Sequence, residues 1–253
     1  MDALQLIALI GWCFTVALAG GLVGLVLGNL RLPAVLLLAS SPAAGAGANI
    51  GVSSVAAVAA ATAHVRAGRI NWRLFAWMAP PSMLGAVAGG YLSGVLPDTA
   101  LLLFIGAVLL YFGVDLLRST SDDPSSQPHA TTERLDIRAA VIAGAAIGLL
   151  GGIVGLILGA LRMPALLRYV GEVPARAVGT NLAVGVCVGL AGVVGHAPDG
   201  VDWDLLAIGS AASIPGAVLG ARLTGRLSER ALLHAIGAVL VVTGVATGAQ
   251  ALI

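Results

Sequence analysis

Long runs without a charged residue dominate the chain, and short polar stretches separate them. Eight runs are found, at Ala3–Leu30, Leu32–Val65, Leu74–Pro97, Thr99–Val114, Ala139–Leu161, Ala177–Pro198, Leu205–Ala221 and Ala231–Ile253. Most of them meet or approach the ~20 apolar residues that a helix needs to cross the hydrocarbon core of a bilayer. Because lipid offers the backbone no hydrogen-bond partner, such long runs without polar–apolar alternation predict helices rather than barrel strands. The expected fold is an all-α polytopic membrane protein.

Composition and charge narrow the class of protein. Of the 253 residues, 58% are hydrophobic and 10% are charged, and the mean hydropathy is +1.01. Soluble domains, in contrast, carry roughly 25% charged residues. The net charge is +1 and all 13 basic residues are arginines without a polybasic tail, so nucleic acid is not an expected partner. The first apolar run lacks the basic segment of a cleavable signal and is expected to stay as a helix.

No residue pattern indicates a metal, a cofactor or catalysis. Cys13 and Cys187 are single thiols inside apolar runs, without the spacing of a disulfide framework or a metal site. Asp122 and Asp123 lie in a stretch rich in Pro and Ser, where a solvated loop is expected, and no apolar run contains an Asp or a Glu. We therefore expect neither an enzyme nor a carrier of cations.

The chain contains an internal repeat. Gly20–Leu36 reads GGLVGLVLGNLRLPAVL and Gly151–Leu167 reads GGIVGLILGALRMPALL, with 12 identical residues in 17 positions at an offset of 131. The same offset matches Gly85–Leu109 to Gly216–Leu240. The two halves of the chain are therefore expected to be homologous units.

A polar segment joins the two copies. Ser119–Asp136 reads STSDDPSSQPHATTERLD, and its Pro, Ser and charged residues are typical of an exposed linker. The expected organisation is a first transmembrane repeat at 1–118, a linker at 119–136 and a second transmembrane repeat at 137–253.

Opposite charge in matching loops favours an inverted orientation of the repeats. The loop before Trp72 contains arginines, while the matching loop before Trp203 contains aspartates and no basic residue. By the positive-inside rule the first loop faces the cytoplasm and the second does not. Opposite sidedness of matching loops predicts inverted repeats, and these need an odd number of crossings in each half.

An odd number requires a fifth segment in each half beside the four apolar runs. We expect a pair of glycines to end a short first helix, and the Arg-x-Pro element that follows to interrupt a second, discontinuous one, since proline removes a backbone donor and restricts the preceding residue. The helix breaks are expected at Gly20, Gly21, Pro33, Gly151, Gly152 and Pro164. If this stretch is instead a simple loop, each half has four crossings and the repeats run parallel.

Arg31 and Arg162 are permanent charges between apolar segments. An arginine near the bilayer midplane costs at least ~2.5–3.5 kcal/mol on insertion scales, so it should face a wet cavity or a partner. A broken helix also frees backbone N–H groups whose partial positive charge favours an anion. Two such elements would supply converging anion sites. The alternative is that both arginines are interfacial loop charges that orient the protein.

Asn49 and Asn181 recur a few residues into an apolar segment, at an offset of 132. A buried amide must find hydrogen-bond partners, and it can donate to an oxyanion or to a carbonyl of a broken helix. Thr180, Ser53 and Ser54 lie on neighbouring turns and complete the expected substrate-binding set. The alternative roles for the asparagines are an interhelical hydrogen bond or a helix N-cap.

Several short motifs follow one another along the chain. They are a Gly-rich segment followed by RLP or RMP, the pair AGAGANI and ARAVGTNL, and GRINWRL followed by PPSMLGAVAGG. Together they resemble the TauE/SafE sulfite exporter family over nearly the full chain. The resemblance implies a multi-pass permease of the bacterial inner membrane that moves sulfite, sulfoacetate or related organosulfur anions, usually outward. It also points to the Asn49 and Asn181 regions and the glycine-rich broken segments as the pathway, although Ala48 lacks the hydroxyl that Thr180 offers.

We therefore expect a transporter that exports a small sulfur-containing anion by alternating access, with one half rocking against the other. An anion channel, or a permease for another small anion such as a carboxylate, is the alternative. The expected partners are the anionic substrate and the lipid bilayer, and a homodimer is compatible with the sequence.

Overall fold

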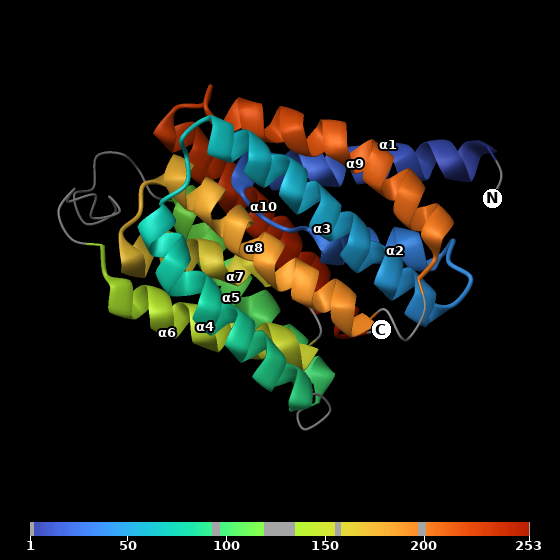
Figure 1. Ribbon diagram of the computed structural model, residues 1–253, viewed down its shortest axis with the longest axis horizontal. Helices are drawn as coiled ribbons and strands as arrows, with labels where there is room; N and C mark the ends of the chain where they lie inside the picture. The colour runs from blue at the N-terminus through green and yellow to red at the C-terminus, as the bar shows by residue number, and fades with distance from the viewer. Residues whose placement is uncertain (1–2, 93–96, 119–134, 155–157, 197–200, 253) are drawn as a thin grey trace.

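The computed structural model describes residues 3–92, 97–118, 135–154, 158–196 and 201–252 (Figure 1). The first half contains α1 (Ala3–Val23), α2 (Gly28–Leu36), α3 (Pro42–Arg66), α4 (Trp72–Tyr91) and α5 (Asp98–Arg118). The second half contains α6 (Ile137–Val154), α7 (Gly159–Pro164), the π-helical segment η1 (Ala165–Val170), α8 (Pro174–His196), α9 (Trp203–Thr224) and α10 (Glu229–Gln250). Since α7 runs directly into η1, each half has five helical segments in the same order.

Several of these helices are long and apolar enough to cross a membrane. The five that qualify are Ala3–Val23, Ala44–Arg66, Thr99–Arg118, Trp203–Thr224 and Glu229–Gln250. Shorter apolar helices cover Ile137–Ile153 and Pro174–Leu190. Within the residues that the structure describes there is no strand. The prediction of an all-α, multi-pass membrane protein is confirmed.

The chain leaves the first helix at Gly24, beyond the predicted break at Gly20 and Gly21. Gly24 has φ +75°, and the Leu25 N–H donates to the Gly20 carbonyl at 2.9 Å, which closes the helix as in a Schellman motif. Gly21 has another role, because a Cβ there would lie 2.3 Å from the Ala217 carbonyl oxygen of α9. The predicted location of the break is thus corrected: this glycine allows close packing inside a continuous helix.

The second half shows the same shift. α6 continues through Gly151 and Gly152 and ends at Val154, so these glycines do not break it either. A Cβ on Gly152 would lie 2.1 Å from the Ala86 carbonyl oxygen of α4. Residues 155–157 lie outside the described residues. At the far end of α7 the helix type changes from α to π directly after the predicted break residue, Pro164.

Pro33 does not interrupt α2, in contrast to the prediction. It lacks the N–H that would have donated to the Asn29 carbonyl one turn earlier. The side-chain amide of Gln250, in α10, donates to that carbonyl instead, at 3.0 Å. A contact from a distant helix thus replaces the missing hydrogen bond, and the interruption lies before α2 rather than at its proline.

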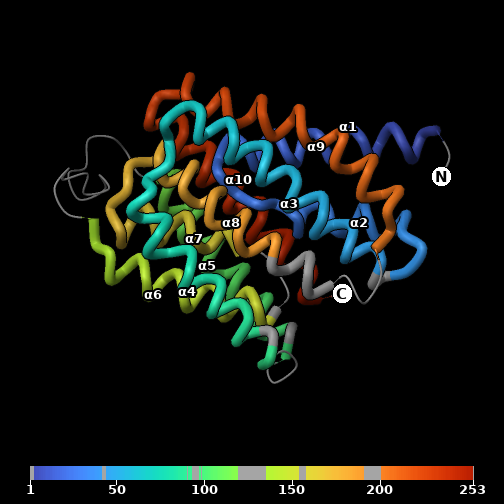
Figure 2. The backbone as a smooth tube through the Cα atoms, viewed as in Figure 1, coloured from blue at the N-terminus to red at the C-terminus, as the bar shows by residue number. Residues whose placement is uncertain are grey.

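Each half packs its helices against those of the other. α1 lies along α9 and α4 lies along α6, so the first helix of each half contacts the fourth helix of the other (Figure 2). α5 pairs with α10, and α3 packs on α8. The same set of pairs results when the two halves are exchanged.

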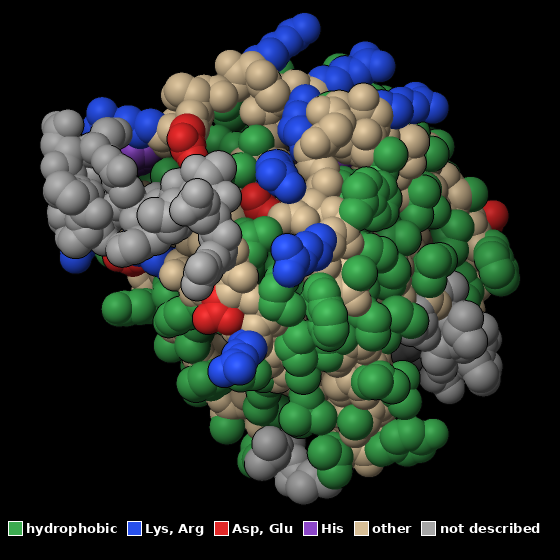
Figure 3. All heavy atoms as spheres, turned by 60° about the vertical axis from the view of Figure 1, so that its left-hand side comes forward, with side chains coloured by type: hydrophobic (Ala, Val, Ile, Leu, Met, Phe, Trp, Pro, Cys, Tyr) green, Lys and Arg blue, Asp and Glu red, His purple; other side chains and the backbone are tan. Residues whose placement is uncertain are grey.

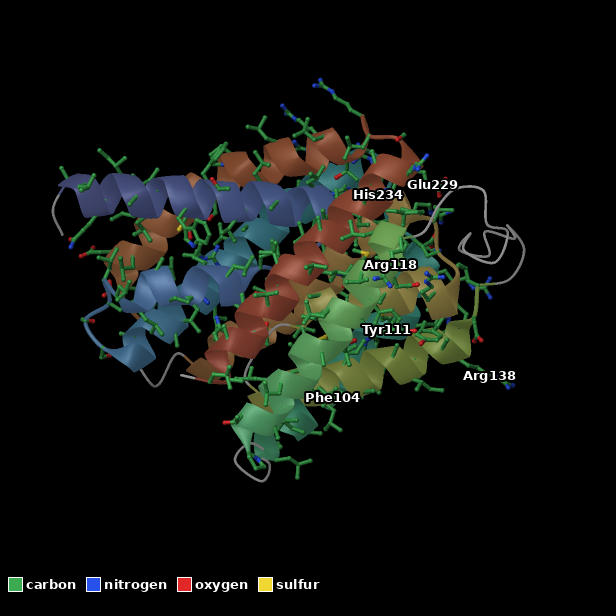
Figure 4. All side chains as sticks on the ribbon, turned by 180° about the vertical axis from the view of Figure 1, so that it is seen from behind. Phe104, Tyr111, Arg118, Arg138, Glu229 and His234 are labelled. Atoms are coloured by element: carbon green, nitrogen blue, oxygen red, sulfur yellow. The ribbon has the colours of Figure 1, made fainter. Side chains whose placement is uncertain are left out.

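α5 and α10, which correspond to each other in the two halves, run in opposite directions. A Cβ on Gly106 would lie 3.0 Å from the Gly244 carbonyl oxygen, whereas one on Gly113, later in α5, would lie 3.0 Å from that of Gly237, earlier in α10. Figure 4 shows the consequence: the end of α5, at Arg118, and the start of α10 lie at the same end of the molecule.

α1 and α9, by contrast, run in the same direction and approach very closely. A Cβ on Gly216 would lie 2.4 Å from the Phe14 carbonyl oxygen, and one on Gly220 would lie 2.1 Å from the Leu18 carbonyl oxygen. α4 and α6 make the equivalent contacts. Small residues at four-residue spacing let two helix backbones touch, which is the usual basis of helix association in membranes.

The arginines of the described residues, apart from Arg31 and Arg162, gather at one end, the basic end, where α3, α5 and α9 end and α4, α6, α8 and α10 begin. They are Arg66, Arg69, Arg73, Arg118, Arg138, Arg168, Arg176, Arg222, Arg226 and Arg230. Contacts such as Arg69 Nη1 donating to the Ala221 carbonyl at 2.7 Å join these helix ends. In Figure 3 the blue side chains lie mainly in the upper and left parts of the view, whereas the lower right is mainly apolar.

Replacing Gly220 with valine should lower the thermal stability of the protein. The new Cβ would lie 2.1 Å from a backbone oxygen of α1, so α1 and α9 would have to separate. Overpacking of this kind costs roughly 1–3 kcal/mol. Gly248→Val is the matched control, because nothing lies within 4 Å of a Cβ at that position of α10. The unfolding temperature of the detergent-purified variants checks this, and equal values for the two would contradict the packing.

Candidate functional site

Arg31 lies in the first half of α2 and is only 2% exposed. Its Nε donates to Asn49 Oδ1 at 3.0 Å, and its Nη2 donates to the Asn49 carbonyl at 3.1 Å and to Ser53 Oγ. Asn49 and Ser53 are four residues apart in α3, so both side chains face the same neighbour. The short helix α2, which packs on α3, thus holds a guanidinium group inside the protein.

Arg162 occupies the matching place in the second half and is 1% exposed. Its Nη1 donates to Asn181 Oδ1 at 3.2 Å. Its Nε is buried and has no hydrogen-bond partner among the residues that the structure describes. The two arginine sites therefore share an asparagine partner, but the second arginine is less completely satisfied than the first.

Each asparagine connects an arginine to the backbone of a helix break. Asn49 Nδ2 donates to the Gly28 carbonyl at 3.0 Å. Asn181 Nδ2 donates to the Gly159 carbonyl at 2.9 Å and to the Gly24 carbonyl, in the other half, at 2.7 Å. The amide thus accepts from the cation with its oxygen and donates to a carbonyl with its nitrogen. Interhelical hydrogen bonding, the alternative role considered above, is therefore part of what these residues do.

Neither buried guanidinium has an acidic partner among the described residues. The two ion pairs in this part of the chain are Arg168–Asp115 and Arg176–Glu172. Hydrogen bonds to amide and hydroxyl dipoles offset part of the loss of hydration but leave two positive charges inside an apolar protein. No three His, Cys, Asp or Glu side chains of the described residues lie where they could hold a metal ion. The site's electrostatic preference is for an anion.

A cavity of about 40 Å³ lies between the starts of α2 and α7. Its polar lining comes from Asn29, Asn49, Ser53, Thr243 and Thr247, and Gly28 and Ala160 supply backbone from the two short helices. Since a buried water needs ~10–15 Å³, the space is suited to a few waters or one small solute. A second cavity, of about 20 Å³, is lined by Ser53 and Arg31, so Ser53 borders both spaces.

Two features of the cavity lining suit a polar solute. Thr243 Oγ1 is buried and has no hydrogen-bond partner among the described residues. The residues that precede α2 and α7 are Leu27 and Leu158, neither of which caps its helix with a side chain. The amide groups at both helix starts therefore lack the side-chain acceptor that most helices have, and their partial charge is positive.

Two residues of the predicted site lie elsewhere. Thr180 Oγ1 accepts from the Asn71 backbone N–H at 3.0 Å, in the loop between α3 and α4. Ser54 Oγ donates to the Ile50 carbonyl of its own helix at 2.9 Å. The structure thus brings together Arg31, Asn49 and Ser53 in one half and Arg162 with Asn181 in the other.

Glu172 is a buried acidic residue that carries no signal in the local sequence. It is 3% exposed, and it accepts hydrogen bonds from Asn71 Nδ2 and from the Val173 N–H. Arg176 Nε lies 3.7 Å from its carboxylate. Because Glu172 lies in a short stretch with Gly and Pro between η1 and α8, its local pattern predicts only a loop. In the structure it joins the two halves at the basic end.

His64 supports the segment that leads into the first break. Its position at the end of a helix, beside a polar loop, predicts an interfacial side chain, yet it is completely buried. Its Nε2 lies 3.2 Å from the Gly21 carbonyl, to which it must donate, and its Nδ1 lies 3.5 Å from Arg69 Nη1. Thr224 Oγ1 donates to the Leu22 carbonyl at 2.7 Å. The last turn of α1 is thus held from both α3 and α9.

Comparison with known proteins identifies the family of the chain. The family model described as sulfite exporter TauE/SafE matches residues 9–247, which include both Arg–Asn pairs. A protein of Xylella fastidiosa (strain Temecula1 / ATCC 700964) described as a probable membrane transporter protein is 30% identical over 238 residues, covering 88% of this chain and 90% of that protein. No solved structure matches the chain. The chain therefore belongs to the TauE/SafE sulfite exporter family of membrane transporters.

Proposed function

We propose that the protein exports a small sulfur-containing anion, such as sulfite, sulfoacetate or a similar organosulfonate, across the bacterial inner membrane. The observation that carries the proposal is the burial of Arg31 and Arg162 without an acidic partner among the described residues. A resident carboxylate would neutralise these charges and compete with an anionic solute. The described residues place no carboxylate at either site, so a positive potential remains that a small anion can neutralise reversibly. The description of the family as sulfite exporters supports the choice of substrate.

The hydrogen bonds of the site suggest how an anion binds. Arg31 and Arg162 donate to asparagine oxygens, which are neutral acceptors. Arg31 lines the smaller cavity, and its partners Asn49 and Ser53 line the larger one. An oxyanion in these spaces is a stronger acceptor than an amide, so it can take over part of the donors of Arg31. The hydroxyl of Thr243 and the uncapped starts of α2 and α7 supply further donors on the cavity side. Binding of an anion therefore replaces neutral hydrogen-bond acceptors with a charged one.

The directions of corresponding helices support an inverted arrangement of the two halves. α5 and α10 are antiparallel, and the loop that follows α3 contacts the start of α8 through Asn71 and Thr180. In parallel repeats the end of α3 would instead lie beside the end of α8. An inverted repeat lets one half take the conformation of the other, so that the site opens alternately to the two sides.

The unequal surroundings of the two arginines are consistent with alternating access. Arg31 makes three hydrogen bonds, whereas Arg162 makes one and leaves its Nε unpaired. Inverted repeats hold their halves in different conformations at any moment, and transport exchanges the two. The contact between Asn71 and Glu172 joins the halves at the basic end, so rocking of the halves must break it.

Replacing Arg31 or Arg162 with glutamine should slow sulfite efflux from proteoliposomes by about ten- to a hundredfold, because a charge-assisted hydrogen bond contributes roughly 1.5–3 kcal/mol. Arg226→Gln, which removes an exposed charge at the basic end, is the control and should keep wild-type flux. The unfolding temperature of both site variants should fall only slightly, because glutamine removes a buried charge without an acidic partner but leaves acceptors such as Asn49 Oδ1 with fewer donors. Unchanged flux in both site variants would exclude arginine from the mechanism.

Sulfite, sulfoacetate, sulfate and acetate should be distinguished when their fluxes are measured side by side. We expect saturable flux that is fastest for sulfite or sulfoacetate, since the cavity is small and lined by hydrogen-bonding side chains. A current that rises linearly with voltage would indicate a channel instead. Fastest flux for acetate would assign the protein to carboxylates.

The basic end should face the cytoplasm by the positive-inside rule. In a background with Cys13→Ala and Cys187→Ala, a cysteine replacing Asp204 should react with a membrane-impermeant maleimide in spheroplasts. A cysteine replacing Arg226 should react only after the membrane is permeabilised. Both positions are exposed and lie at opposite ends of α9. Labelling of both from the same side would contradict the orientation.

A further inference from the structure

A lateral groove between α3 and α9 is separate from the cavity between the starts of α2 and α7. Its volume is about 440 Å³, and it lies near the basic end. The lining includes Thr62, Arg66, Arg69, Ile214, Val218 and Arg222, and the described part of the chain adds no acidic residue to it. Figure 1 shows α3 and α9 side by side over this length, and the two helices are in contact.

The groove changes from apolar to basic along its length. Ile214, Val218 and Arg222 are spaced by four residues in α9, so they form one stripe that ends in a positive charge. On the other wall, Thr62 is followed one turn later by Arg66, at the end of α3. Both walls therefore carry their arginines at the basic end, and Ala59 of α3 and Ile214 of α9 form the apolar part toward the middle of the molecule.

We propose that this groove binds one phospholipid with an anionic headgroup, with an acyl chain along its apolar part and the phosphate among its three arginines. Ile214, Thr62, Arg66 and Arg222 are all exposed, so the groove opens sideways to the surrounding lipid. A soluble anion would need only the arginines. The apolar continuation along Ile214 and Val218 fits an acyl chain and favours lipid as the occupant.

Arg69 connects the groove to the end of α1, where the helix break that precedes Arg31 begins. One of its terminal nitrogens donates to the Ala221 carbonyl at 2.7 Å and lies 3.5 Å from His64 Nδ1. His64 in turn donates to the Gly21 carbonyl of α1, just before the break that leads to Arg31. Burial lowers the pKa of Arg69 without removing its charge, so a phosphate beside it would offset part of the lost hydration of the guanidinium. The bound lipid thus stabilises the joint between α1, α3 and α9.

Native mass spectrometry of the detergent-purified protein tests the proposal. With phosphatidylglycerol and phosphatidylcholine of matched chains in equal amounts, the protein should retain phosphatidylglycerol about tenfold more. The double variant Arg66→Gln/Arg222→Gln should bind it on the order of tenfold more weakly, because each arginine near an anionic headgroup contributes. Arg73→Gln/Arg226→Gln removes the same charge from exposed positions of the basic end outside the groove lining, and should retain the lipid.

A second variant separates lipid from a soluble anion. Val218→Trp fills the apolar part of the groove and leaves its arginines in place, so it too should lose phosphatidylglycerol. Displacement of the lipid by an equal concentration of glycerol 3-phosphate would overturn the proposal in favour of a soluble anion. An equal loss in the Arg73→Gln/Arg226→Gln control would also overturn it, since general surface charge would then explain the binding. Neither measurement depends on which solute is transported.

Discussion

The burial of two guanidinium groups without carboxylates is the constraint on which the other features of this structure depend. A cation inside an apolar protein must have its donors satisfied, and a carbonyl exposed by a broken helix must have a donor. Asn49 and Asn181 meet both requirements, because each amide accepts from an arginine and donates to a glycine carbonyl. The helix break, the asparagine and the arginine therefore form one unit, and the loss of any member leaves the others unsatisfied.

The two units are also connected to each other. Gly24 adopts a left-handed conformation that ends α1, and its carbonyl accepts from Asn181 of the other half. A Cβ at Gly24 would meet the backbone of Val178 at 2.6 Å, so the turn packs directly on α8. A movement of one half therefore acts on the arginine unit of the other through backbone contacts, without a long chain of side chains between them.

Features that depend on local composition could be predicted from the sequence. Hydropathy indicates helices, and the repeat identifies Arg31, Arg162 and the two asparagines as a matched set. Helix spacing also indicates which hydroxyl lies beside which asparagine. Ser53 is one turn from Asn49 and shares its face of the helix, whereas Thr180 is adjacent to Asn181 and points in another direction.

Contacts between distant parts of the chain could not be predicted in this way. Pro33 is accommodated because Gln250, 221 residues beyond Asn29, supplies the missing donor, and no local pattern contains that information. Packing glycines such as Gly21 likewise resemble helix-ending glycines until the neighbouring helix is known.

The pairing of α1 with α9 also has a consequence for biosynthesis. Cys13 and Ser213, which share a hydrogen bond across this pair, are separated by 200 residues. At ordinary translation rates about 10–40 s pass between their emergence from the ribosome. During this time the glycine-contacting face of α1 can be covered only by lipid, by other early helices or by the insertion machinery. The nascent chain is therefore most vulnerable to proteolysis and mispairing before its last two helices enter the bilayer.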